Sequence, residues 1–144
     1  MVRPEIVNRK LSHLRMYLQE LERHKDVSLV SYQAKGGPRR EIERLLQLIV
    51  EVAVDINTHL ITESEGLPPT DYRQSFKGAA RAGVITQELA ETLMPAAGLR
   101  NALVHDYAEV DDKRVHAAIP LALAGFRDYS TQVVSWLDSN QGAG

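Results

Sequence analysis

Residues 39–61, with the sequence RREIERLLQLIVEVAVDINTHLI, decide the fold of this chain. Apolar residues recur there at helical spacing along one face: Ile42, Leu45, Leu46, Ile49, Val52, Ala53, Ile56 and Leu60. Leu48, Val50 and Val54 make much of the remaining surface apolar as well. A helix that is apolar on more than one side needs more than one neighbour, which favours a place inside a helical bundle.

The residues before this stretch predict a second helix. It runs from Pro4 to about Ala34, with apolar residues at helical spacing, namely Ile6, Leu11, Leu14, Leu18 and Leu21. Gly36 and Gly37 form a loop between the two helices. Pro38 fits the first helical position of the next helix, which runs to about Thr62.

The residues after it predict a loop and a short helix. Residues 63–72, ESEGLPPTDY, are typical of a turn-rich loop, and a helix of about ten residues follows and ends at Gly83. Thr86 can cap a fourth helix that runs through Tyr107. Pro95 interrupts this helix, and we expect a kink there.

The last predicted helix begins after a break at residues 108–112, where Asp111 or Asp112 acts as the cap. It runs to about Ser139, with a second kink at Pro120. No segment alternates with period two, and no internal repeat is visible. The predicted fold is therefore all-α: an up-and-down bundle of four long helices plus a short helix, with a single domain over residues 1–139 and a frayed tail over 140–144.

Composition excludes several classes of function. The chain has no cysteine, which excludes a thiolate nucleophile and a cysteine-based zinc or iron–sulfur site. Its 17 basic and 19 acidic side chains are mixed along the sequence, so no global field attracts nucleic acid or a membrane. The N-terminal residues lack the apolar run of a signal peptide, and no window approaches the length of a membrane span. We expect a soluble cytoplasmic protein without a membrane partner.

Residues 99–107, LRNALVHDY, carry the polar side chains that point to chemistry. On a helix, Asn101 and His105 share a face, while Arg100 and Tyr107 nearly eclipse each other, so the four form one ridge. Arg100 and His105 lie about 140° apart around the helix, and a phosphate between them meets both. Arginine matches phosphate oxygens and imidazole exchanges protons near neutral pH, which suits RNA cleavage by its own 2′-hydroxyl without a metal.

The spacing by itself leaves a structural alternative open. In that interpretation Arg100 pairs with a carboxylate of the bundle, His105 caps the C-terminal end of its helix, and Tyr107 packs. The other histidines, His13, His24, His59 and His116, have no partner at metal-ligand spacing, so no metal site is predicted.

The stretch matches the R-x-x-x-x-H-x-Y signature of the HepT-like toxins, a branch of the HEPN superfamily of small helical ribonucleases. The resemblance extends over residues 39–61, 68–85 and 88–111, which read in the order of the family, and so covers most of the chain. It implies a HEPN-like homodimer whose paired motifs face each other in a composite cleft and cleave RNA without a metal. By this resemblance Arg100 and His105 are catalytic, and Asn101 positions the substrate.

The resemblance also implies a partner and a mode of control. In this family the motif tyrosine, here Tyr107, receives adenylyl groups from ATP through a small nucleotidyltransferase antitoxin, and the added phosphate charge blocks RNA. The chain is thereby predicted to be the toxin of a type VII toxin–antitoxin pair that needs no cofactor for cleavage. The alternatives are a non-catalytic module of the same fold that binds a nucleotide or RNA, and a structural partner of a nucleotidyltransferase.

Two further groups of charged residues have both a functional and a structural interpretation. Glu51 and Asp55 are four apart on the helix over 39–62, and an acid there can orient Arg100 or His105; the alternative is a solvated stripe. Arg39, Arg40 and Arg44 form the densest basic cluster in the sequence. They either contact RNA phosphates away from the cut site or mark a solvated helix start.

Overall fold

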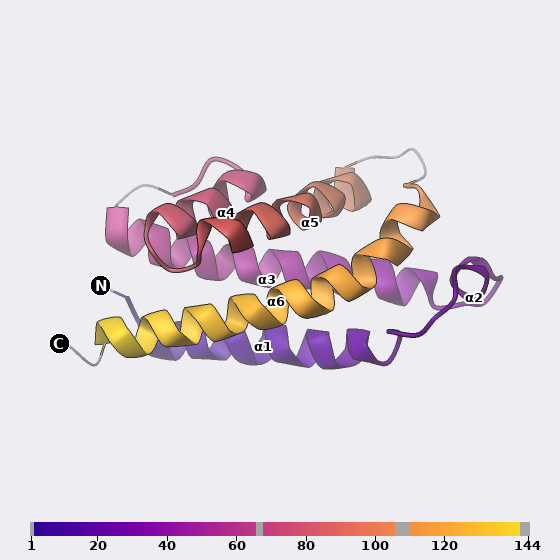
Figure 1. The fold of residues 1–144 in the computed structure, drawn as a ribbon, viewed down its shortest axis with the longest axis horizontal. Helices are drawn as coiled ribbons and strands as arrows, with labels where there is room; N and C mark the ends of the chain where they lie inside the picture. The colour runs from indigo at the N-terminus through magenta and orange to yellow at the C-terminus, as the bar shows by residue number, and fades with distance from the viewer. Residues whose placement is uncertain (1, 66–67, 106–109, 142–144) are drawn as a thin grey trace.

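The computed structural model describes residues 2–65, 68–105 and 110–141, and these form six α-helices without a strand. The helices are α1 (Pro4–Glu22), α2 (Leu29–Gln33), α3 (Arg39–Glu65), α4 (Tyr72–Arg81), α5 (Gln87–His105) and α6 (Asp112–Gln141). Figure 1 shows α1, α3 and α6 running along the long axis of the molecule, with α4 and α5 beside α3. The predicted all-α, up-and-down bundle is confirmed.

The helix over residues 39–65, α3, is the centre of the bundle because it packs against α1, α4, α5 and α6. Its second apolar face is covered within the monomer, since Val50 and Val54 are both buried. Leu48 is half-buried. The apolar excess that this helix shows in sequence is therefore explained by its four neighbours in the same chain.

The same helix corrects one expectation. Residues Arg39–Ser64 contain an 18-residue window with a mean hydropathy of 1.4, so by length and composition this segment passes the test for a membrane span. Because 61% of that window is buried inside the bundle, the helix serves as a core element. The expectation that no window approaches span length is wrong, since a core helix surrounded by neighbours is as apolar as a spanning one.

The predicted helix over residues 4–34 is broken, which is the main correction to the fold. The chain leaves α1 at Glu22, turns through residues 23–28, and resumes helix only in the short α2. After Leu21 no apolar residue follows until Val27, so the buried stripe of α1 ends there. The Ser28 side chain then caps α2 by accepting a hydrogen bond from the Ser31 backbone at 3.0 Å, and this competes with helix continuation.

The remaining helix ends differ from the predictions by a few residues. The helix α3 begins one residue after Pro38, whose carbonyl accepts from the Ile42 backbone at 3.0 Å, and it runs three residues beyond Thr62. Gly83, with φ of 81°, follows α4. Asp111 is the cap of α6, because its side chain accepts from the Lys113 backbone at 2.9 Å. That helix reaches Gln141, so its last two residues are helical where a frayed tail was expected.

The two predicted helix interruptions do not split their helices. Pro95 lies inside α5 and Pro120 lies inside α6, and each helix continues on both sides of its proline. Figure 1 shows α6 bending near its amino-terminal end, where it turns towards α5. A proline removes one backbone hydrogen bond and allows such a bend without ending the helix.

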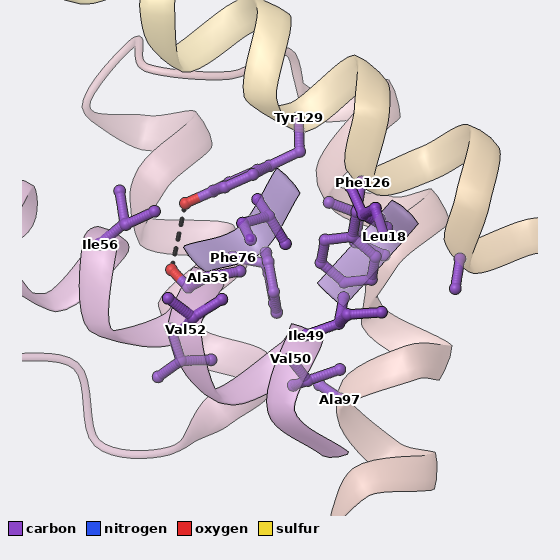
Figure 2. Close-up of a cluster of buried hydrophobic side chains, with 14 of the residues drawn as sticks. Leu18, Ile49, Val50, Val52, Ala53, Ile56, Phe76, Ala97, Phe126 and Tyr129 are labelled. Atoms are coloured by element: carbon purple, nitrogen blue, oxygen red, sulfur yellow. Dashed lines mark hydrogen bonds between the residues drawn. The ribbon is translucent and has the colours of Figure 1, made fainter. Parts of the chain in front are cut away.

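An aromatic cluster joins α4 and α6 over the middle of α3 (Figure 2). The rings of Phe76, Phe126 and Tyr129 lie pairwise 6.2 Å apart between centroids, with interplanar angles of 64° to 76°. Such edge-to-face pairs are favourable beyond the area that they bury. The cluster therefore fixes where α4 sits, and α4 borders the polar end of α5.

A buried polar network supports the same placement. The Tyr129 hydroxyl lies 2.6 Å from the Asn57 side-chain oxygen and 3.1 Å from the carbonyl oxygen of Ala53, the contact that is drawn in Figure 2. The Asn57 amide in turn donates to the Ser75 hydroxyl at 2.9 Å. Because buried polar groups are costly when unpaired, this network links α3, α4 and α6 in one arrangement.

Candidate functional site

The helix α5 presents Arg100, Asn101 and His105 in its last two turns. Thr86 caps the start of this helix as predicted, since its hydroxyl accepts from the Leu89 backbone at 3.1 Å. The described part of the predicted ridge ends at His105, and Tyr107 lies outside the described residues.

Glu51 of α3 holds one edge of the Arg100 guanidinium. Arg100 donates from Nε at 3.0 Å and from Nη2 at 2.8 Å, both to the same carboxylate oxygen of Glu51. Gln47 donates to that oxygen at 3.0 Å as well. Only 13% of the Arg100 side chain and 27% of the Glu51 side chain are exposed, so solvent screens this pair less than a surface pair.

Tyr72, the first residue of α4, covers the face of the same guanidinium. The Arg100 Cζ atom lies 4.2 Å from the centroid of the Tyr72 ring, which is cation–π geometry. Burial raises the pKa of the Tyr72 hydroxyl above its ordinary value of 10.0, so the ring stays neutral beside the arginine. Helices α3 and α4 thus fix the Arg100 side chain from two directions.

The third guanidinium nitrogen of Arg100 faces Asn101. Arg100 Nη1 donates to the Asn101 side-chain oxygen at 3.3 Å, while both residues remain partly exposed. His105 is exposed and makes no hydrogen bond or ion pair with another described residue. The site therefore combines a positioned guanidinium with an accessible imidazole, two groups that can stabilise charge and transfer a proton.

The two acids predicted to orient the motif are placed differently. Glu51 contacts Arg100 directly, as described above. Asp55, one turn further along α3, lies 3.8 Å from the Lys10 ammonium of α1, and 64% of its side chain is exposed. The structure brings Glu51 to the motif, whereas no described contact joins Asp55 to it.

The three arginines of the predicted basic cluster also differ in their contacts. Arg39 donates to Asp112 at 2.6 Å and lies over the Tyr32 ring, so it joins the start of α3 to the start of α6. Arg40 and Arg44 are exposed. Contact with RNA by any of the three stays a prediction.

Tyr72 is a site residue that sequence reasoning missed. In sequence it is one of several scattered aromatic residues and is interpreted as packing. Only the packing of α4 across α5 brings its ring to Arg100. In sequence, Tyr72 stands next to Asp71, the cap of α4, and so indicates only the start of a helix. Nothing in the sequence near Tyr72 predicts its contact with Arg100, which is 28 positions away.

An apolar groove lies next to the motif, between α3, α5 and α6. It has a volume of about 250 Å³, and its lining includes Leu46, Leu93, Pro95, Ala96, Leu99 and Leu121. At its edge the Leu121 side chain is 65% exposed. In the described ranges, no three His, Asp or Glu side chains gather in a way that holds a metal ion.

Comparison with other sequences matches most of the chain to one family. The profile described as Ribonuclease HepT-like matches residues 14–133. The tRNA nuclease HepT of Aphanizomenon flos-aquae is 34% identical over 137 residues, which cover 94% of this chain and 92% of that protein. The mRNA nuclease HepT of Shewanella oneidensis is 38% identical over 66 residues, which cover 46% of this chain and 50% of the relative.

Solved structures share the fold at lower identity. YutE from Bacillus subtilis, a cytosolic protein of unknown function, has a TM-score of 0.81 at 18% identity, covering 98% of this chain and 94% of its own. The tri-AMPylated HEPN toxin of Shewanella oneidensis, in complex with the MNT antitoxin, has a TM-score of 0.80 at 23% identity. That match covers 90% of this chain and 97% of the toxin. These likenesses show that the chain has the HEPN toxin fold.

Proposed function

This chain belongs to the ribonuclease HepT-like family, and from that premise we propose that it is the toxin of a toxin–antitoxin pair and that it cleaves RNA at Arg100 and His105. One observation carries the proposal. Arg100 is held along one edge by Glu51 and over its face by Tyr72, which leaves Nη1 directed to Asn101 on the helix that also carries the exposed His105. A positioned cation beside an accessible imidazole supports phosphodiester cleavage.

The proposed reaction needs only proton transfer and charge stabilisation. His105 accepts the proton of the 2′-hydroxyl, the 2′-oxygen bonds to phosphorus, and the P–O5′ bond breaks. The leaving 5′-oxygen takes up a proton from water, His105 returns its proton to solvent, and the products are a 2′,3′-cyclic phosphate and a 5′-hydroxyl. Arg100 stabilises the charge on the phosphorus oxygens, and Asn101 positions the phosphate. Since these groups supply both functions, the reaction is proposed to require no metal and no cofactor.

Incubation of unmodified protein with RNA in excess EDTA tests this proposal. We expect cleavage that leaves 2′,3′-cyclic phosphate ends, and a loss of about a hundredfold or more in Arg100→Ala and in His105→Ala. His13→Ala is the matched control, because His13 is an exposed histidine on α1, and it should cleave like the wild type. Intact RNA with the wild-type protein would overturn the nuclease proposal and leave a binding module or a structural partner of a nucleotidyltransferase.

We propose that the active form is a homodimer and that the apolar groove beside the motif seats the second copy. The groove is lined partly by α5, and Leu99 on its wall is the direct neighbour of Arg100. A second copy that covers this groove brings a second motif helix close to the first, as a composite cleft requires. Burial of exposed apolar surface such as Leu121 supplies the driving force for association.

The oligomeric state tests the dimer. Leu121→Asp places a charge at the edge of the groove and is expected to give a monomer by light scattering, with loss of RNA cleavage. Val30→Asp is the control, because Val30 is also an exposed large apolar residue but lies on α2. A Leu121→Asp protein that stays dimeric and active would contradict this assignment of the groove.

Control of the toxin is proposed to act through Tyr107, in the cytoplasm, where RNA and ATP are both present. A nucleotidyltransferase antitoxin would transfer the adenylyl group: the Tyr107 oxygen bonds to the α-phosphorus of ATP, its proton is lost, and pyrophosphate leaves. The new phosphate lies two residues from His105 and repels RNA. The intact mass should rise by about 329 Da per group after incubation with the antitoxin and ATP, and Tyr107→Phe should stay unmodified.

A further inference from the structure

A second arginine, Arg73 of α4, lies over α5 and has no hydrogen bond or ion pair with any residue in the described ranges. Its guanidinium covers position 98: a Cβ added to Gly98 would stand 2.5 Å from Arg73 Nη2, 3.4 Å from Cζ and 3.5 Å from Nε. Gly98 is itself buried, while the Arg73 side chain is exposed. The guanidinium is thus placed against α5 but keeps its hydrogen-bonding groups available.

Gly98 is the residue that allows this close approach. A glycine inside a helix destabilises it relative to alanine, so its presence at position 98 needs a reason. Real Cβ atoms essentially never approach a neighbour as closely as the 2.5 Å that a side chain at position 98 would require. Any other residue there would displace the guanidinium, so the glycine and the arginine form one unit.

Helix geometry places this unit on the same face as His105. Positions 98 and 105 are seven residues apart, which is about 20° short of two full turns and about 10.5 Å along the axis. Helical side chains lean towards the amino-terminal end, so the His105 side chain leans back towards Arg73. Arg100 lies about 140° away from His105 and is paired with Glu51, whereas Arg73 is, among the described residues, an unpaired cation on the His105 side of α5.

We propose that Arg73 binds an RNA phosphate that flanks the scissile phosphodiester on the His105 side. A separation of about 10.5 Å along α5 is short enough for nearby phosphates of one RNA strand to reach both groups. A guanidinium without an acidic partner forms a forked, charge-assisted pair with a phosphate. The inference rests on the proposed function, since it names how the RNA substrate is held.

Binding measurements separate this inference from the nuclease proposal. In a His105→Ala background, which cannot cleave, we expect Arg73→Ala to weaken binding of a short single-stranded RNA about tenfold, the lower end for a lost charge-assisted hydrogen bond. The slope of log affinity against log salt should fall by about one. In the cleaving protein, the same change should raise KM and leave kcat nearly unchanged. Arg81→Ala, at the other end of α4, is the matched control and should change none of these values.

Gly98→Ala provides a second test that leaves Arg73 in the sequence. Because the contact is with the end of a flexible side chain, we expect the protein to fold and the guanidinium to be displaced. The variant should raise KM in the wild-type background and have no further effect in Arg73→Ala, as coupled residues do in a double-mutant cycle.

Three results would overturn the inference. The first is wild-type RNA affinity and salt slope in Arg73→Ala, and the second is an additive effect of Gly98→Ala. The third is a loss of antitoxin binding in Arg73→Ala at unchanged RNA affinity, which would assign the arginine to an acidic protein partner. If the wild-type protein fails to cleave RNA, the nuclease proposal is wrong. The RNA-binding measurements in the His105→Ala background still test the role of Arg73.

Discussion

At the scale of single residues, the position of Arg100 depends on Glu51. The two residues lie 49 positions apart in sequence, on α5 and α3, and one carboxylate oxygen of Glu51 accepts three hydrogen bonds. An arginine side chain has four rotatable bonds, so without this partner its planar group would sample many orientations. In the proposed reaction this pair would hold the guanidinium in place. The same contact also fits the structural alternative, in which Arg100 pairs with a carboxylate of the bundle.

Glu51→Gln tests this role. The change keeps the shape of the side chain and removes its charge, so we expect RNA cleavage to fall about tenfold and the free energy of unfolding to fall by about 1 to 2 kcal/mol. Cleavage assays and urea unfolding measure the two effects. Glu91→Gln, at an exposed acid of α5, is the control and should lie within about 0.5 kcal/mol of the wild type. Wild-type cleavage by Glu51→Gln would show that Arg100 needs no orienting acid.

Glu43 gives a prediction about pH. Burial raises the pKa of its carboxyl above the ordinary value of 4.5, Arg39 opposes this shift, and Asp112 adds to it. The folded state then holds the proton more tightly than the unfolded state. The stabilisation of the folded state by this proton is fully present below pH 4.5 and is lost as the pH rises through the raised pKa.

The matching variant is Glu43→Gln, which is neutral at every pH. It is expected to be more stable than the wild type at about pH 7, and the difference should vanish by about pH 3.5, where both side chains are neutral. Urea midpoints at the two pH values measure this. An equal difference at both values would mean that the carboxyl does not titrate between them.

At the scale of elements, the short helix α4 connects the fold to the site. It is ten residues long, and its first turn carries both Tyr72 and Arg73. Its amino-terminal end is stabilised by Asp71, whose side chain accepts from the Gln74 backbone at 2.8 Å. Helices of this length are marginal alone, so the cap and the packing of Phe76 together hold the first turn in place.

Asp71→Ala tests the importance of this first turn. Loss of the cap should lower the free energy of unfolding by about 1 kcal/mol and lower RNA cleavage as Tyr72 loses its position over Arg100. Thr86→Ala removes the cap of α5 at the end far from the motif, so it should have a similar cost in stability and leave cleavage unchanged. Equal losses of cleavage in both variants would point to a general loss of stability.

At the scale of the whole molecule, one buried network sets the arrangement of the helices. Tyr129, Asn57 and Ser75 come from α6, α3 and α4 and satisfy one another inside the core. Burial raises the pKa of the Tyr129 hydroxyl well above its usual range, so the group stays protonated. The network is a three-helix connection that no single helix contains.

Tyr129→Phe removes the hydroxyl and leaves the Asn57 side-chain oxygen without that partner. We expect a loss of about 1 to 3 kcal/mol, seen as a melting temperature lowered by several degrees. Cleavage well below the melting temperature should not change, because the aromatic packing remains. Tyr17→Phe is the control, since Tyr17 is only half-buried. A melting temperature equal to that of the wild type would show that the network adds no stability.

Much of the fold was predictable because its signals are local. The apolar period of each long helix, the cap Thr86 and the glycine after α4 are patterns of neighbouring residues and lie where the sequence predicts them. Of the two predicted caps of α6, the structure selects Asp111. The break between α1 and α2 is not predicted by the sequence, because residues 23–28 contain no glycine or proline to mark the end of a helix.

The amino-acid sequence alone predicts an all-α bundle with Arg100, Asn101 and His105 on one helix, because the spacing of residues along a helix sets which side chains share a face. It also identified the family, through a motif that is local. The packing of the helices is needed to see that Glu51 and not Asp55 contacts Arg100, that Tyr72 covers the Arg100 guanidinium, and that Arg73 lies over Gly98. Those contacts join residues 25 to 49 positions apart, and they arise because α3, α4 and α5 pack against one another, which spacing within a single helix cannot reveal.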